Sequence, residues 1–132
     1  VLALGLACYF IGETSWAISN FATSGTQFLA WGFLVPTIAL YHATFSVNSL
    51  AHIFGTRKFE TSDDSRNNGI VSLITLGEGW HNNHHFSPSS SRQGFFKGQF
   101  DPTHRVLQIL SLLGLVWGLK KTPSWVQEKA IN

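Results

Sequence analysis

The sequence predicts an all-α membrane protein in which transmembrane helices are followed by a cytoplasmic helical cap domain. Two observations predict this class. Residues 28–47 are 20 consecutive positions without Lys, Arg, Asp or Glu, and a helix of about 20 residues spans the hydrocarbon core of a bilayer. All nine Lys and Arg residues lie after Gly55, and Glu13 is the only Asp or Glu before it. We therefore expect a membrane part over residues 1–55 and a polar part over residues 56–132.

The membrane part is expected to contain a short apolar helix, a loop and a spanning helix. Residues 1–12 are apolar but would extend only about 18 Å as a helix, so we interpret them as the second half of a truncated spanning helix. Residues 13–27 are rich in Ser, Thr, Asn and Gly, which is typical of an external loop. The spanning helix is expected over residues 28–52, and the positive-inside rule places the residues after it in the cytoplasm.

Composition excludes several classes of protein. A length of 132 residues allows one domain at most. The net charge of +2 is too weak to indicate a nucleic-acid-binding protein. The single cysteine, Cys8, excludes an internal disulfide framework and a multi-cysteine zinc site. Because the chain has no methionine and begins at Val1, we interpret it as a fragment.

The polar part is expected to be helical on both sides of a turn-rich break at residues 87–91. Before the break, a polar connector leads into an apolar run over residues 69–76. After it, Asp101 is a predicted N-cap with Pro102 at the first helical position, and the helix is expected to reach about Leu119. The uncharged core of this last helix is too short to span a bilayer. It could lie at the membrane surface as an amphipathic or interfacial helix, or pack onto the rest of the domain.

Four of the six histidines fall in two places. His52 lies at the polar end of the long apolar segment, and His81, His84 and His85 lie within the sequence HNNHH. On a helix the last three are related as i, i+3 and i+4, so their imidazoles share one face. Imidazole is the commonest neutral metal ligand and suits iron, zinc, copper and nickel. The sequence therefore predicts a metal site.

Zinc hydrolysis is the obvious alternative chemistry, but its motifs carry a glutamate base between the histidines. Here Asn82 and Asn83 occupy those positions, so that base is missing. His52 alone could be a helix-end histidine, yet beside a second histidine group we interpret it as a fourth ligand. Asn48 lies one turn before it on the same helix face. Glu78, three residues before His81, could orient the second ring nitrogen of that histidine or could be a solvated surface residue.

Two motifs, N-S-x-x-H over residues 48–52 and G-E-G-x-H-N-x-H-H over residues 77–85, together resemble the C-terminal part of the membrane fatty acid desaturases. The similarity is to the bacterial Δ9 acyl-CoA or acyl-lipid type, which is related to stearoyl-CoA desaturase. It continues through residues 88–96 and 112–117, so it covers most of the chain.

The resemblance implies a di-iron centre that uses O2 and two electrons to introduce a cis double bond into an acyl chain. Carried over residue by residue, four histidines match iron ligands, and Asn48 matches an asparagine that reaches one iron through water. Thr44 and Phe45 match positions at the bend of the acyl tunnel, and Glu78 is assigned to the second shell of ligands. No catalytic residue is predicted beyond the ligands. The histidines in question are His52, His81, His84 and His85.

The chain departs from the family pattern because it has no histidine before His42, whereas family members carry two earlier histidine boxes. We therefore expect this piece to hold only part of the ligand set and to be inactive alone. The implied partners are an acyl-CoA or acyl-lipid substrate, a small electron carrier (ferredoxin, cytochrome or rubredoxin) and the bilayer, with no nucleic acid. The expected location is multi-pass in a bacterial inner membrane, with the histidines on the cytoplasmic side.

Two other functions stay open at this point. One is a related di-iron membrane fatty acid hydroxylase or monooxygenase, which can share histidine boxes and differ in product. The other is a non-enzymatic, membrane-anchored metal-binding module.

Overall fold

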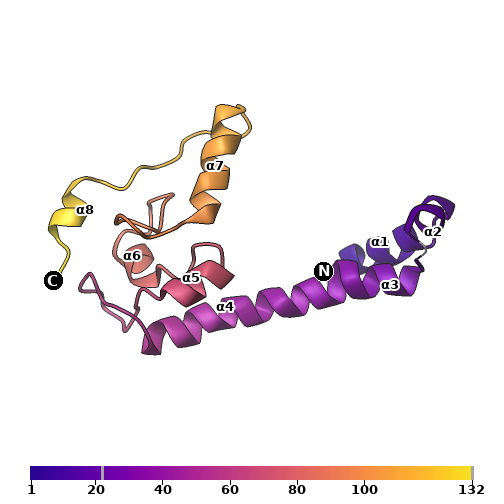
Figure 1. Cartoon of the computed structure of the whole chain (residues 1–132), viewed down its shortest axis with the longest axis horizontal. Coiled ribbons are helices and arrows are strands. Elements are labelled where there is room, and N and C mark those ends of the chain that lie inside the picture. The colour runs from indigo at the N-terminus through magenta and orange to yellow at the C-terminus, as the bar shows by residue number, and fades with distance from the viewer. Residues whose placement is uncertain (22, 132) are drawn as a thin grey trace. The chain divides into compact units, whose positions relative to one another are not determined.

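The computed structural model describes residues 1–21 and 23–131, and within them it shows helices, turns and isolated β-bridges but no β-strand (Figure 1). This confirms the predicted all-α class. The chain divides into two compact units, Val1–His42 and Ala43–Asn132. The boundary between these units falls within the long apolar helix, so the last turns of that helix belong with the histidine-bearing unit.

The first unit begins with three short helices, α1 (Leu2–Gly12), α2 (Ser15–Phe21) and α3 (Gly25–Leu29). The expected loop over residues 13–27 is therefore wrong, since α2 and the start of α3 lie within it. Its polar residues act as helix caps: the Ser24 hydroxyl accepts a hydrogen bond from the backbone N–H of Gln27 at 3.3 Å. The Gln27 side chain accepts one from the backbone N–H of Ser24 at 3.0 Å, which completes a capping box.

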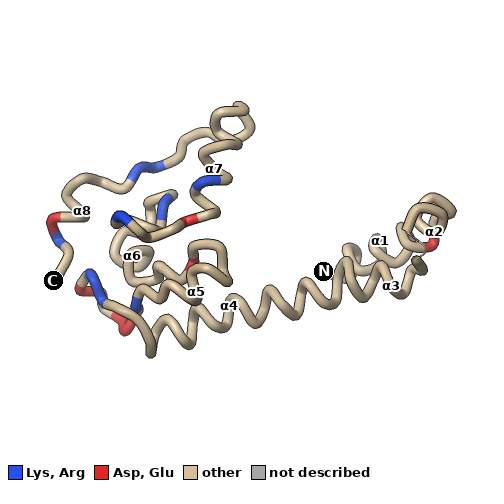
Figure 2. The backbone as a smooth tube through the Cα atoms, in the orientation of Figure 1, with Lys and Arg blue, Asp and Glu red and all other residues tan. Residues whose placement is uncertain are grey.

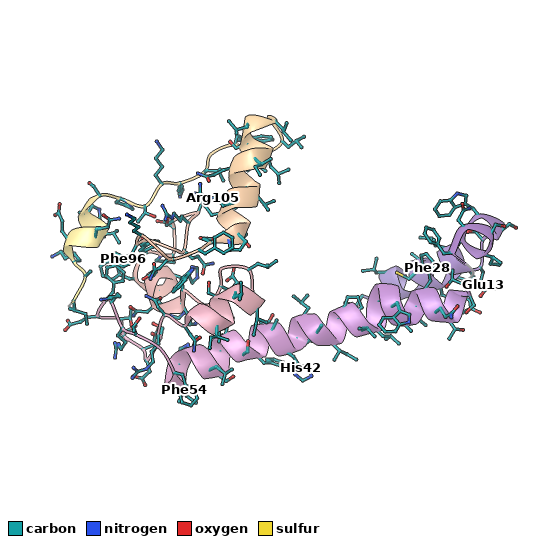
Figure 3. All side chains as sticks on the ribbon, viewed as in Figure 1. Glu13, Phe28, His42, Phe54, Phe96 and Arg105 are labelled. Atoms are coloured by element: carbon teal, nitrogen blue, oxygen red, sulfur yellow. The ribbon has the colours of Figure 1, made fainter. Side chains whose placement is uncertain are left out.

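Helices α1 and α3 pack closely where small residues meet. A Cβ atom added to Gly12 would lie 2.6 Å from Cβ of Phe28 and 2.8 Å from Cα of Gly25. One carboxylate oxygen of Glu13 accepts a hydrogen bond from the backbone N–H of Gly25 at 2.6 Å, at the N-terminus of α3, where a negative charge is favourable. Figure 3 labels Glu13 and Phe28 at this contact. The single acidic residue of the first unit thus caps a helix.

Helix α3, the π-helical turn η1 (Ala30–Leu34) and α4 (Val35–Ile53) form one helical run, Gly25–Ile53. These 29 residues are long and apolar enough to cross a membrane, in agreement with the spanning helix expected over residues 28–52. Helices α1 and α2 pass the same test together as a pair bent by 69°. The π turn has a cause in Pro36, whose ring lacks an N–H and is incompatible with the α-helical position of the carbonyl four residues earlier, that of Gly32.

The second unit contains α5 (Gly69–Ile74), α6 (His81–Phe86), α7 (Pro102–Leu112) and α8 (Trp125–Glu128) in addition to the end of α4. Asp101 caps α7 as predicted, since its carboxylate accepts a hydrogen bond from the backbone N–H of His104 at 3.0 Å. The helix ends seven residues before the expected Leu119. The chain turns at Gly114, which has a φ of +72°, and residues other than glycine rarely adopt that conformation.

A small aromatic cluster forms the core of the second unit. Phe59, Phe95 and Val126 are buried. The ring of Phe86, the last residue of α6, stacks on that of Phe59 with 4.2 Å between centroids. Figure 2 shows that the charged residues gather around this unit, which holds every Lys and Arg of the chain. The core is small, so polar contacts must hold much of the unit in place.

Candidate metal centre

Helices α4 and α6 bring three histidines to one point. The Nε2 atoms of His52 and His81 lie 3.1 Å apart, although 29 residues separate them in the sequence. One ring nitrogen from each of His52, His81 and His85 falls within 4.8 Å of the others. Two imidazole nitrogens bound at right angles to one ion, at about 2.0–2.1 Å each, lie about 3 Å apart. The three residues present therefore fit a metal ion.

His84 lies beside this group without joining it. Its ring centroid is 6.3 Å from that of His81 and 5.8 Å from that of His85, and the set of converging nitrogens does not include it. The structure therefore brings together three of the four predicted histidines at one point. His84 presents a separate imidazole on the same short helix.

Asn82 anchors the histidine helix to the loop that precedes α5. Its side chain is fully buried. Its Oδ1 accepts hydrogen bonds from the backbone N–H groups of Lys58 and Phe59, both at 2.8 Å. Its Nδ2 donates to the carbonyl of Phe59 at 3.0 Å. One side chain thus satisfies three backbone groups that would otherwise be buried without partners.

Asn83 anchors the same helix on another side. Asn67 Nδ2 donates to Asn83 Oδ1 at 2.6 Å, and the backbone N–H of Asn83 donates to Asn67 Oδ1 at 3.1 Å. Asn83 Nδ2 donates to the carbonyl of Gln93 at 2.7 Å and to Oε1 of Gln99 at 2.8 Å. In the sequence, these asparagines indicate that a glutamate base is missing. The sequence did carry a sign of this anchoring role, because two poor helix formers occupy adjacent positions between histidines.

Glycines allow the segment before α6 to approach α5. Gly77 has a φ of +125°, and a Cβ atom on it would lie 2.7 Å from a carboxylate oxygen of Asp101. A Cβ atom on Gly79 would overlap the backbone nitrogen of Ser72. Both positions of the G-E-G motif therefore require glycine, because of close approach at both and backbone conformation at the first.

Backbone pairing fixes the end of α4 to the same framework. The backbone N–H of Arg66 donates to the carbonyl of Ala51, next to His52, at 2.7 Å. Thr56 and Asn67 form an antiparallel bridge, and Asn67 forms a second one with Trp80, the residue before His81. His52 and His81 are therefore connected through Asn67 by short chains of backbone hydrogen bonds.

The electrostatics of the centre favour neutral imidazole on His81. Burial, and to a smaller extent the neighbouring imidazoles of His85, His52 and His84, lower the pKa of His81 to about 4. A metal ion requires the deprotonated ring. Protons therefore compete weakly for this ligand near neutral pH.

A carboxylate absent from the sequence predictions touches the centre. Asp63 Oδ2 contacts Nδ1 of His85. Hydrogen bonding from Ser65 holds the pKa of Asp63 well below its usual range, and the contact with His85 lowers it further. Asp63 therefore carries its negative charge at neutral pH. No local pattern marks it in the sequence, since it is one acidic residue in a polar connector.

The remaining predicted residues lie outside this cluster of contacts. Thr44, Phe45 and Asn48 are exposed on α4, with Asn48 one turn before His52. Glu78 is exposed, and among the described residues no hydrogen bond joins it to His81. The structure tests none of the proposed roles of these four residues, which stay predictions.

These features define a helical protein that has one apolar run long enough to cross a membrane and a candidate metal centre of three histidines at the end of that run. Within that class, the chain belongs to the fatty acid desaturase family, whose family model matches residues 1–95.

Curated relatives agree with this family. The chain is 44% identical over 103 residues to an sn-1 stearoyl-lipid 9-desaturase of Synechocystis, covering 78% of this chain and 32% of that protein. It is 37% identical over 121 residues to a chloroplastic palmitoyl-monogalactosyldiacylglycerol delta-7 desaturase of Arabidopsis thaliana, covering 92% and 32%. It is 40% identical over 108 residues to an acyl-CoA 5-desaturase of Anemone leveillei, covering 82% and 33%. The chain thus spans about a third of the length of these relatives.

Proposed function

We propose that the full-length protein containing this chain is a di-iron fatty acyl desaturase, which introduces a cis double bond into an acyl chain with O2 and two electrons. The observation that carries the proposal is the convergence of His52, His81 and His85 on one point at the end of an apolar helix. The double bond is proposed at Δ9, although the names of the relatives include positions 5, 7 and 9.

The four predicted histidines are proposed to hold iron, with Asn48 reaching one iron through water. The remaining ligands would come from residues of the full-length protein beyond the 132 present here. When bound, the two irons would supply the oxidising power needed to break unactivated C–H bonds. The donor set suits this role because imidazole is a ligand for iron.

The residues of the chain itself are proposed to bind and position the substrate. Thr44 and Phe45 lie on α4 about two turns before His52, which suits the bend of a tunnel that leads an acyl chain toward the histidines. The apolar surface of α4 would exclude water from the reacting carbons and so prevent side reactions. The buried amides of Asn82 and Asn83 would keep α6 in one position while substrate enters.

The substrate is proposed to be an acyl-CoA or an acyl-lipid, since relatives of both kinds share the family. Electrons would come from a small carrier of the ferredoxin, cytochrome or rubredoxin type. The run Gly25–Ile53 has 29 residues, more than the roughly 20 that a bilayer core requires, so the His52 end can extend beyond the hydrocarbon. We propose a multi-pass location in a bacterial inner membrane, with this end on the cytoplasmic side.

Product analysis of the full-length protein tests the proposal. The protein would be expressed in a bacterial host, and fatty acid methyl esters and their dimethyl disulfide adducts would be analysed by mass spectrometry. A new cis alkene at Δ9 is expected. A hydroxylated chain would favour the related hydroxylase instead, and iron binding without any new product would favour a non-enzymatic metal-binding module.

The 132-residue chain on its own gives a complementary test. Because it carries only part of the proposed ligand set, we expect the purified chain to form no acyl alkene when supplied with iron, reductant and substrate. Binding of two irons per chain with turnover would contradict the proposal that further ligands are needed.

A further inference from the structure

We propose that Asp63 is a positioning residue of the metal centre, which holds the ring of His85 through Nδ1 so that Nε2 is directed toward His52 and His81. This inference rests on the proposed metal-binding function. It concerns a residue that touches a ligand and does not itself join the converging nitrogens.

Each of the two carboxylate oxygens of Asp63 has its own partner. Asp63 Oδ2 contacts Nδ1 of His85, and Asp63 Oδ1 accepts a hydrogen bond from the backbone N–H of Ser65 at 2.9 Å. The second bond fixes the rotation of the carboxylate, so the oxygen facing His85 has a defined direction. The carboxylate is therefore prepared to accept the Nδ1 hydrogen of His85.

The loop that carries Asp63 is itself attached to the histidine helix. The Thr61 hydroxyl donates to the backbone carbonyl of Asp63 at 3.1 Å, and it accepts a hydrogen bond from Asn82 Nδ2 at 3.4 Å. Arg57 donates to the carbonyl of Thr61 at 3.1 Å. Since Asn82 belongs to α6, Asp63 and His85 share one frame, and their contact depends little on distant parts of the molecule.

The consequence for His85 concerns its tautomer. A ring that donates its Nδ1 hydrogen to a carboxylate carries its free lone pair on Nε2, and metal-binding histidines ordinarily use their second nitrogen in this way. The ring centroid of His85 lies 4.2 Å from that of His81 and 5.9 Å from that of His52. Without Asp63, the ring could rotate and could adopt the other tautomer, so part of the protein would have no ligand at this position.

The sequence offered a different carboxylate for this type of role. Glu78 was predicted to orient His81, but within the described chain the carboxylate that contacts a clustered histidine is Asp63, and the histidine is His85. The neighbour Asp64 gives a matched control. Its side chain is 83% exposed, and its carboxylate is 3.8 Å from the guanidinium of Arg57.

The experiment compares Asp63→Ala, Asp63→Asn and Asp64→Asn in the full-length protein. Metal affinity would be measured by competition with a chelator, using Fe(II) and Co(II), and the absorption spectrum of the Co(II) form would report ligand geometry. Asp63→Ala is expected to weaken binding about 10–100-fold and to alter the Co(II) spectrum. Asp63→Asn keeps a hydrogen-bond acceptor but no charge, so its metal affinity should lie between those of Asp63→Ala and the parent protein. Asp64→Asn should stay within about twofold of the parent protein.

Metal affinity and a Co(II) spectrum of Asp63→Ala equal to those of Asp64→Asn would overturn the role of Asp63. A parent protein that binds neither metal would instead overturn the proposed metal centre, so the two failures are distinguishable. Thermal melting of the metal-free variants separates positioning from folding. If Asp63→Ala does not fold, Asp63→Asn decides, and parent-like affinity in that variant would count against the proposal.

Discussion

Different interactions stabilise the interior of each of the two units of this chain. In Val1–His42, helices α1 and α3 meet through Gly12 and Gly25, and Glu13 provides a charged contact. In Ala43–Asn132, the apolar core is small, and the buried amides of Asn82 and Asn83 connect α6 to the surrounding loops. Helices in lipid gain little from burying apolar surface and associate through close packing. A metal-binding site needs its polar groups paired in a fixed geometry. The contrast between close packing in the first unit and paired amides in the second can be tested in each unit separately.

The largest expected effect comes from removing a ligand in the second unit. His81→Ala in the full-length protein should lower the rate of acyl desaturation by at least about 100-fold, since changes in residues that only support ligands already cost about 10–100-fold. Product formation per mole of protein would measure it. His104→Ala is the matched control, because His104 contacts the carbonyl of Ser91 and lies outside the histidine group. Equal losses in both variants would contradict the assignment.

The next largest effect is a loss of stability when a buried amide of the second unit is removed, compared with an exposed amide of the first unit. Asn82→Ala would leave three backbone groups of Lys58 and Phe59 without partners, and each costs about 1–3 kcal/mol. We expect the free energy of unfolding to fall by about 3 kcal/mol or more, measured by denaturant titration in detergent. Asn20→Ala, an exposed amide on α2 in the first unit, should change it by at most about 0.5 kcal/mol. Comparable losses would show that burial of the amide is unimportant.

A pH effect is expected in the second unit. The pKa of His81 is about 4 in the folded protein, below the ordinary value of 6.5, so between these values the unfolded chain binds a proton that the folded chain does not. The stability of the metal-free protein should therefore fall as pH drops from about 6.5 to about 4, by up to about 3 kcal/mol. Unfolding titrations at several pH values would measure this, and His81→Gln should flatten the profile. An unchanged slope in that variant would contradict the role of His81.

The smallest effect tests close packing in the first unit. Gly12→Ala would place a methyl group 2.6 Å from Cβ of Phe28 and force the helices apart, at a cost of about 1–3 kcal/mol. Gly32→Ala is the matched control, because its methyl group would lie 3.6 Å from Sγ of Cys8, an ordinary contact. Denaturant titration of both variants would measure the difference. If Gly12→Ala were as stable as Gly32→Ala, close helix packing would not be what holds this unit.

The sequence predicted the elements that depend on local pattern and missed those that depend on tertiary contact. The long apolar helix followed from an uncharged run, and the cap at Asp101 followed from cap chemistry. The loop over residues 13–27 was wrong because capping residues such as Ser24 are also the residues of loops. Helix α7 was predicted too long because its apolar pattern continues past Gly114, where the backbone turns.

In the candidate site, too, features set by local pattern were predicted and features set by tertiary contact were missed. Spacing placed His81 and His85 on one helix face, whereas His52, 29 residues away, was assigned because the chain carries a second histidine group, and the family resemblance supported that assignment. Asp63 could not be selected among the six acidic residues of the polar part, because its contact with His85 exists only after the loop folds onto α6. Asn82 and Asn83 were visible in the motif, but their burial was not.

Asn67 has a kinetic consequence. Its backbone exchanges hydrogen bonds with Thr56 at 2.7 and 3.0 Å, and its side chain bonds to Asn83. Amides that depend on one shared residue open together, as a cooperative unit of local unfolding. Hydrogen exchange at Thr56, Asn67 and Asn83 is therefore expected to report one shared free energy of opening. The end of α4, which carries His52, and helix α6, which carries the other three predicted ligands, would then fold and unfold in one event. Protein with only part of these histidines in place would therefore be rare.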